Sequence, residues 1–254
     1  MTVITVATLN LRNRSDRWLE RRQLIVNELT ERQPDLLSIQ EIFLPIGQAK
    51  WIRSQLNSRL TGTSKSPYTL IQKRRRHLIQ GYYEGIGILS KVPVISQDLV
   101  HLGYGGRIGL RVSVELEGRK PCDFVSVHLH NIAGDREARE EQVLRLVSWL
   151  KERNPSPHQV VAGDFNEVPD GLAVQLMRQS YRSAFVEFRG SDPIATFPTA
   201  LRSDVEWSGC LDYIFISRAV KQVLDAGLFC TKPSPADPTL YPSDHVGLIA
   251  VLEL

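Results

Sequence analysis

Closely spaced strands in residues 67–130 constrain the fold of this chain more than any other feature of its sequence. Apolar residues, alternating or continuous, predict strands at 68–72, 85–90, 94–102, 107–116 and 122–130. Because a crossover between parallel strands needs a dozen or more residues, many of these neighbours must pair antiparallel. Elsewhere we predict strands at 3–9, 35–40, 160–163, 211–217 and 246–252 and helices at 16–32, 45–60, 137–153 and 172–179. The sequence therefore predicts layered α/β structure with mixed sheets rather than a doubly wound nucleotide-binding fold.

The composition is that of a folded globular chain. The 254 residues are 42% hydrophobic and 23% charged, so enough apolar surface is available to offset the entropy cost of folding, which excludes intrinsic disorder. A chain of this length forms one or two domains. No repeat, low-complexity segment or flexible linker marks a boundary in the sequence.

Cysteine content and apolar runs bear on the cellular compartment. The three cysteines, Cys122, Cys210 and Cys230, form neither a disulfide framework nor a CxxC metal site. The N-terminal segment lacks the pattern of a signal peptide, and no apolar run approaches the roughly 18 residues of a membrane span. We therefore expect a cytoplasmic protein without a membrane span.

The charge balance gives little information about partners. Thirty-one Lys and Arg against 28 Asp and Glu leave a net charge of +3, which is too small to indicate nucleic-acid binding. The densest basic run extends from Lys73 to His77. Such a run is compatible with phosphate contacts and equally with a solvated hairpin tip.

Several predicted strands end in polar side chains that are suited to catalysis or to metal binding. Taken singly, an Asn or Asp at such a place is most often a turn former or helix cap, and a lone His is most often structural. If the strand ends converge, however, one cleft receives Asn10, Glu41, His128, Asp164, Asn166, Asp212, Asp244 and His245. Carboxylate and amide oxygens are suitable ligands for Mg²⁺ or Mn²⁺. Imidazoles beside carboxylates can move protons near neutral pH.

The order of short motifs resembles a known superfamily. The segments are TLN (8–10), QE (40–41), EGIGILSK (84–91), VHL (127–129), GDFN (163–166), LDYIF (211–215) and SDH (243–245). This set resembles the endonuclease/exonuclease/phosphatase superfamily with its DNase I-like fold, and the combination of GDFN and SDH is its most specific part. The resemblance implies a four-layer α/β sandwich, in which two packed mixed sheets are flanked by helices and the active site lies at one end. Since the motifs would share one cleft, we expect residues 1–254 to form a single catalytic domain, acting as a monomer.

The resemblance also implies metal-dependent hydrolysis of a phosphate ester. The implied ligands of Mg²⁺ or Mn²⁺ are Asn10, Glu41 and Asp244. The implied catalytic residues are His128 with its partner Glu84, His245 with its partner Asp212, and Asp164 with Asn166. The two imidazoles would flank the scissile phosphate, while the GDFN residues would orient the attacking water and a phosphate oxygen or hold a second metal. Two readings of the general base remain open, namely a His–carboxylate pair and the Asp of GDFN.

The substrate is the least constrained expectation. Expected substrate contacts are Asn131, Thr196 in a loop that resembles the family's TFPT segment, and Trp207, for which a core position is the alternative. His128 resembles the DNase I, sphingomyelinase and inositol-phosphatase branches rather than the abasic-site endonucleases. The sequence favours a phosphodiesterase, with nucleic acid among its candidate substrates. The alternatives are a phosphoesterase for a small-molecule or lipid phosphate and a non-catalytic binding module, against which the complete set of site residues argues.

Overall fold

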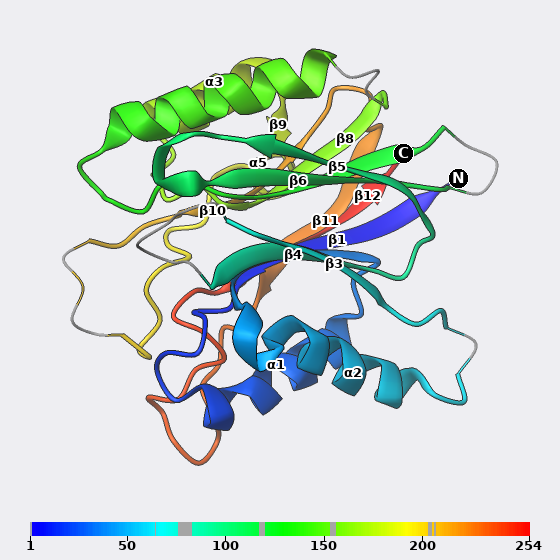
Figure 1. The fold of residues 1–254 in the computed structure, drawn as a ribbon, viewed down its shortest axis with the longest axis vertical. Helices are drawn as coiled ribbons and strands as arrows, with labels where there is room; N and C mark the ends of the chain where they lie inside the picture. The colour runs from blue at the N-terminus through cyan, green and yellow to red at the C-terminus, as the bar shows by residue number, and fades with distance from the viewer. Residues whose placement is uncertain are drawn as a thin grey trace.

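A computed structural model describes residues 2–63, 65–75, 83–116, 120–152, 156–202, 205 and 207–254 of the chain. Two six-stranded sheets pack face to face and helices cover their outer faces (Figure 1). The first sheet has the order β11 (Gln222–Phe229), β12 (Gly247–Glu253), β1 (Val3–Asn10), β2 (Leu36–Phe43), β4 (Glu84–Ser90) and β3 (Thr69–Arg74). The second has the order β5 (Val94–His101), β6 (Ile108–Val114), β7 (Cys122–His128), β8 (His158–Asp164), β10 (Asp212–Ile216) and β9 (Arg182–Ser183). This is the predicted four-layer sandwich.

Each sheet contains one parallel pair whose strands are joined through a helix. Helix α1 (Trp18–Arg32) connects β1 to β2, and α3 (Arg136–Glu152) connects β7 to β8. The other named strand pairs are antiparallel. Among them, β3–β4, β5–β6 and β6–β7 confirm the pairing that the short connections in residues 67–130 predicted. Helix α2 (Gln48–Leu60) packs beside α1, while α4 (Leu172–Ser180) packs beside α3. The short helices are η1 (Leu44–Ile46), η2 (Tyr104–Gly106) and α5 (Ala184–Arg189).

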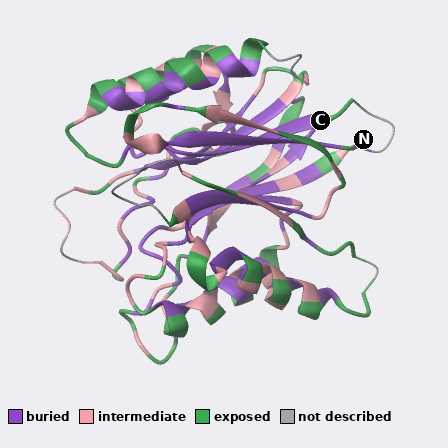
Figure 2. Ribbon diagram, viewed as in Figure 1, coloured by how far each residue is buried: buried purple, intermediate pink, exposed green. Residues whose placement is uncertain are grey.

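The core between the sheets changes from apolar to polar along the strands. Alternate residues of a strand face the same side, so Val160 and Ala162 of β8 lie in this core and Asp164 continues the same face. Likewise, β7 places His128 on the face that buries Phe124. Most strand positions are buried, whereas the outer sides of the helices are exposed (Figure 2). The polar end of the core is therefore fixed by the same alternation that builds the apolar part.

A buried hydrogen-bonded layer separates the apolar core from this polar end. The Ser38 hydroxyl donates to the Ala162 carbonyl across the gap between the sheets and lies 2.7 Å from the Ser126 hydroxyl. The Gln40 amide donates to Ser38 and to Thr8. Because these groups are inaccessible to water, their mutual hydrogen bonds offset the cost of burying them. The layer fixes the two sheets relative to each other next to the polar residues.

Gly163 permits the close parallel pairing that positions the residue after it. A Cβ on Gly163 would lie 2.0 Å from the backbone carbonyl oxygen of Val127, which no side chain tolerates. The glycine of GDFN therefore lets β8 approach β7 and places Asp164 opposite His128 in the register.

The loops that follow β1 and precede β12 are joined by a fully buried arginine, Arg21 of α1. Its guanidinium donates to the carbonyls of Leu11, Arg12, Asn13, Ser15, Asp16 and Pro242. The ends of β1 and the segment before Ser243 are distant in sequence but share this one cation. Arg21 therefore determines where two of the predicted motifs meet.

Not every strand of the structure was expected from the sequence. Strand β11 was not predicted, because a register shift between Val223 and Asp225 breaks the period-two pattern and leaves buried residues at a helix-like spacing of three.

In the basic run, Lys73 and Arg74 end β3 and Arg75 follows it. Arg76 and His77 lie outside the described residues. None of the described helices is long and apolar enough to cross a membrane.

We predict that Arg21→Met lowers the free energy of unfolding by about 3 kcal/mol, because several buried carbonyls lose a charged donor. Urea denaturation followed by circular dichroism measures this change. Arg32→Met, an identical substitution at an exposed position of the same helix, is the control and should change stability by less than about 0.5 kcal/mol. Equal effects of the two substitutions would contradict the role assigned to Arg21.

Candidate active site

The strand ends converge at one end of the sandwich on a cleft of about 110 Å³. The walls come from β2 and β8, from the loops that follow β1, β7 and β8, and from the segments that precede β10 and β12. Its lining residues are Arg12, Glu41, Asn131, Asp164, Asn166, Phe197, Arg202, Trp207, Leu211, Asp244 and His245. Residues from positions 12 to 245 thus form one small polar cavity.

The first group of functional side chains is centred on Asp164, a residue that is only 1% exposed to solvent. Asn10 of β1 donates to its Oδ2 at 2.9 Å, and the Asn166 backbone N–H donates to its Oδ1 at 2.8 Å. His245 Nε2 lies 3.9 Å from the same Oδ2, while His245 Nδ1 lies 2.8 Å from Asp212 Oδ2. The result is a chain of buried polar contacts that links the first sheet to the second.

Two hydroxyl residues support this group. Thr196 donates to Asp212 Oδ2 at 2.7 Å and accepts from the backbone N–H groups of Leu211 and Asp212. Ser243 donates to the Asn10 carbonyl at 2.7 Å. Thr196 is buried behind Asp212 and does not line the cleft, so its position is that of a support rather than the expected substrate contact.

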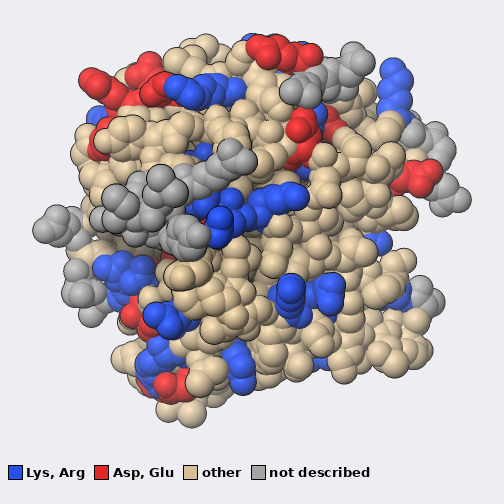
Figure 3. Space-filling model, viewed as in Figure 1, with Lys and Arg blue, Asp and Glu red and all other residues tan. Residues whose placement is uncertain are grey.

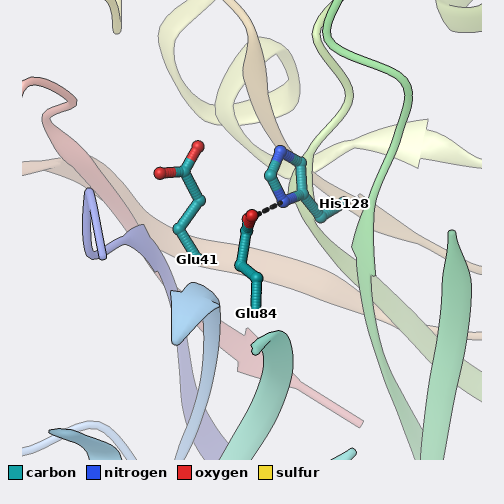
Figure 4. A group of neighbouring side chains, drawn as sticks. All are labelled: Glu41, Glu84 and His128. Carbon is teal, nitrogen blue, oxygen red and sulfur yellow. Dashed lines mark ion pairs between the residues drawn. The ribbon is translucent and has the colours of Figure 1, made fainter. Parts of the chain in front are cut away.

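The second group consists of Glu41, Glu84 and His128 (Figure 4), with one potential ligand atom of each within 4.8 Å of the others. His128 Nδ1 lies 3.8 Å from Glu84 Oε1, and His128 Nε2 lies 3.6 Å from Asp164 Oδ2. Glu41 has a φ of 52° at the place where the β2–β4 register shifts. Bulges of this kind change the direction of a side chain, and here Glu41 faces the same space as Glu84 and His128.

Asp244 is a buried residue of the cleft wall and forms an ion pair with Arg12, which the sequence analysis did not assign to the site. Arg12 Nε lies 3.2 Å from Asp244 Oδ2 and 2.6 Å from Asp16 Oδ2. The backbone of Arg12 is in turn held by the Asn10 side chain, which accepts from its N–H at 2.9 Å. Arg12 therefore places a fixed positive charge on the cleft wall.

Burial and neighbouring charges change the protonation behaviour of the site. Burial, with the charges of Glu84 and Asp244, raises the pKa of Glu41 to about 7. Burial and Asp212 raise the pKa of Asp164 to about 6. In the free cleft both carboxylates therefore hold protons at a higher pH than ordinary carboxyl groups do.

The two imidazoles are driven in opposite directions. Burial alone would lower the pKa of His245, but the carboxylates of Asp212 and Asp164 outweigh it and raise the pKa to about 10. Burial and the positive charges of Arg107 and Arg75 hold the pKa of His128 well below its ordinary value. At pH 7 one imidazole is thus cationic and the other neutral.

The donor set fits a divalent cation of the Mg²⁺ or Mn²⁺ type. Glu41 and Glu84 supply hard oxygen ligands with His128 beside them. A second acidic group, Asp164 with Asp212 and His245, has the same spacing, and Asp212 Oδ1 is buried without a hydrogen-bond partner among the described residues.

The structure places the remaining predicted residues as follows. Asn166 lines the cleft with a φ of 48°, and its side chain donates to the Leu129 carbonyl. Asn131 and Trp207 also line the cleft. The sequence analysis missed Arg12, Arg202 and Phe197, whose ring centroid lies 4.7 Å from that of His245. The position of Phe197 beside Thr196 in the TFPT segment was the available signal.

Comparison with known proteins identifies the family. The family model described as "Endonuclease/Exonuclease/phosphatase family" matches residues 7–245. The chain belongs to the endonuclease/exonuclease/phosphatase family. Members of this family are phosphoesterase hydrolases, which agrees with a cleft built from carboxylates and imidazoles. A search of curated proteins found no match.

Solved structures share the fold of this endonuclease/exonuclease/phosphatase family member. A family protein from Bacteroides vulgatus is 21% identical over 100% of both chains, with a TM-score of 0.79. The human Nocturnin catalytic domain, determined with a bound sulfate anion, is 20% identical over 99% of this chain and 93% of that chain, with a TM-score of 0.77. Truncated TDP2 from Caenorhabditis elegans is 16% identical over 99% and 98%, with a TM-score of 0.75. At these identities the likeness shows the fold alone.

We predict that Glu41→Gln stabilises the metal-free protein at pH 8. Because the folded-state pKa of Glu41 is raised to about 7, above the roughly 4.3 of an unfolded chain, stability falls as pH rises through this window. In EDTA the variant should gain roughly 2–4 °C in Tm at pH 8 and almost nothing at pH 4.5, measured by thermal melts. Glu31→Gln, at an exposed position, is the control, and an unchanged or lower Tm of Glu41→Gln at pH 8 would disprove the prediction.

Proposed function

We propose that this protein is a Mg²⁺- or Mn²⁺-dependent phosphodiesterase that acts on nucleic acid or nucleotide-like diesters. The observation that carries the proposal is the position of Asp164 between two imidazoles, with His128 Nε2 at 3.6 Å and His245 Nε2 at 3.9 Å from its Oδ2. Such an arrangement suits an in-line attack of water on a phosphorus atom. It provides one carboxylate for the water and two nitrogen donors for the phosphoryl oxygens.

The opposite protonation states of the imidazoles suggest different roles. Cationic His245, oriented by Asp212, stabilises the negative charge that develops on a phosphoryl oxygen. Neutral His128, whose Nε2 has no hydrogen-bond partner among the described residues, donates a hydrogen bond from the other side. Because a cationic imidazole cannot accept a proton, Asp164 rather than His245 accepts the proton of the attacking water. Of the two readings that the sequence left open, we therefore propose the Asp of GDFN as the general base.

Metal ligands are proposed from the acidic groups of the cleft. Glu41 and Glu84 would hold the cation, with Asn10 and Asp244 near the cleft wall as further candidates. A bound Mg²⁺ or Mn²⁺ would neutralise phosphate charge and lower the pKa of a water molecule.

Several basic side chains near the cleft support an anionic diester as substrate. Arg12 and Arg202 line the cleft, and Arg75 and Arg107 lie next to His128. In the face drawn in Figure 3, Lys and Arg are spread over the middle and lower parts, whereas the larger groups of Asp and Glu lie toward the top, on the α3 side. The Nocturnin structure was determined with a bound sulfate, a tetrahedral oxyanion like phosphate, and we propose that the cleft of this protein binds a phosphate group of its substrate.

We further propose that residues 1–254 act as one catalytic unit. Strand β12 pairs with β1 along six register positions from Val3 to Thr8, and the cleft needs both Asn10 and His245. A division of the chain between these residues would separate the two sides of the site.

The decisive assay measures turnover of plasmid DNA, bis-p-nitrophenyl phosphate and a phospholipid in Mg²⁺ or Mn²⁺, with Asp164→Ala as the inactive control. We expect hydrolysis of plasmid DNA and bis-p-nitrophenyl phosphate but not of the phospholipid. EDTA should abolish this activity, and addition of either metal should restore it. Full activity in EDTA would reject the metal requirement. Turnover of the phospholipid alone would favour the lipid-phosphate alternative.

We predict that His245→Ala lowers kcat for bis-p-nitrophenyl phosphate by roughly two to four decades, because a cationic donor to the phosphoryl oxygen is lost. Steady-state kinetics at saturating Mg²⁺ measures the effect. His101→Ala, the same substitution at an exposed position of β5, should turn over at the wild-type rate. A kcat of His245→Ala near that of the wild type would exclude the role assigned to this imidazole.

A further inference from the structure

A second, larger cavity adjoins the active-site cleft. Its volume is about 610 Å³, which is within the range of small-molecule binding sites. Its lining residues are Arg75, Tyr104, Gly105, Arg107, His130, Asn131, Ile132 and Asp135. Asn131 belongs to both cavities, so a molecule bound at the scissile position could extend directly into the larger one.

The walls of this cavity are held in place by buried polar side chains of α3. The Gln142 side chain accepts from the His130 backbone N–H at 2.9 Å and donates to the Tyr104 carbonyl at 2.8 Å, thereby joining two separate loops. Arg139 donates to the carbonyls of Ile132 and Ala133 and pairs with Glu167. Both Gln142 and Arg139 are almost completely buried. Buried hydrogen bonds from α3 therefore fix the loops that form the walls of this cavity.

One wall of the cavity is basic, and one of its buried hydrogen-bond donors has no acceptor among the described residues. Arg107 is 3% exposed, and although its Nη2 donates to Asn131 Oδ1 at 3.0 Å, its Nε has no hydrogen-bond partner among the described residues. Burial lowers the pKa of Arg107 to about 10, so the guanidinium remains charged at neutral pH. Arg75 adds a second positive charge, 3.8 Å from Glu84. Because Arg75 and Arg107 both line the cavity, their positive charges would attract an anionic ligand bound there.

The opposite wall is aromatic and apolar. The exposed ring of Tyr104 meets His130 edge-on at a centroid distance of 4.8 Å, and the side chain of Ile132 is also exposed. The one carboxylate, Asp135, is paired with His130 at 3.0 Å. A flat ring at the edge of a basic cavity is the usual platform on which a nucleobase stacks.

We infer that this cavity binds a second phosphate group of the substrate, together with the nucleoside that connects it to the scissile phosphate. Arg75 and Arg107 contact the second phosphate, and Tyr104 stacks on the base. The inference rests on the proposed phosphodiesterase function and makes it more specific. A nucleotide is favoured over an inositol phosphate because an inositol ring has no π-face to stack on Tyr104.

Calorimetric binding in Mg²⁺ buffer tests the inference without requiring turnover. The probes are thymidine 3′,5′-bisphosphate, thymidine 3′- and 5′-monophosphate, and inositol 1,4-bisphosphate. We expect the thymidine bisphosphate to bind at least tenfold more tightly than either monophosphate. Arg75→Gln should reduce this advantage to less than threefold. Tyr104→Leu should weaken thymidine bisphosphate binding about tenfold and leave inositol bisphosphate unaffected.

The matched control is Arg74→Gln, the same substitution at the preceding, exposed position, which should retain the full advantage of the bisphosphate. Tyr104 is 57% exposed, so Tyr104→Leu tests the site even if Arg75→Gln folds poorly. A bisphosphate that binds no more tightly than the monophosphates would overturn the inference, as would equal effects of the Arg74 and Arg75 variants. Inositol bisphosphate binding as tightly as thymidine bisphosphate would exclude the nucleoside assignment. Selective binding without any diester hydrolysis would instead disprove the proposed function and leave the second site in place.

Discussion

The burial of one carboxylate, that of Asp164, is the interaction on which the remainder of the site depends. Removing a carboxylate from water is costly unless its oxygens are hydrogen-bonded or paired. Here the compensation comes from both halves of the sandwich, since Asn10 of the first sheet donates to it and Asn166 of the second donates to it. His245 then pairs electrostatically with Asp164 and Asp212. The sheets are thus joined at the place where the chemistry is proposed to occur.

The same arrangement opposes folding when the cleft holds no cation. Glu41 and Asp164 keep raised pKa values because burial and like charges disfavour their ionised forms. The large apolar core between the sheets and the Arg21 contacts supply the stability that this cluster removes. Carboxylates whose ionisation is disfavoured in this way are common at sites where a bound substrate or ion stabilises the charged form.

Much of the fold could be predicted from the sequence because it follows from the period of two in β-strands, and the cleft residues were predicted as polar side chains at strand ends and from the family motifs. Phe124, Ser126 and His128 share one face, and Asp164 follows Ala162 in the same way. Glu41 was predicted as a polar residue at the end of a strand, but its direction could not be predicted, because the irregular β2 register removes it from that alternation. Arg12, Arg107 and Gln142 were missed because their importance depends on partners distant in sequence, which no local pattern reveals. Strand β11 was missed for the local reason of its bulge.

The polar layer of Ser38, Ser126 and Gln40 has an effect beyond its own hydrogen bonds. Two stacked sheets normally lie about 10 Å apart, a spacing set by the side chains between them. Because His128 and Asp164 belong to one sheet and Glu41 and Glu84 to the other, the thickness of the sandwich sets the width of the proposed catalytic cleft. The layer of Ser38, Ser126 and Gln40 holds that spacing next to the cleft, so substitutions in it would alter the distance between the catalytic side chains of the two sheets without touching any of them.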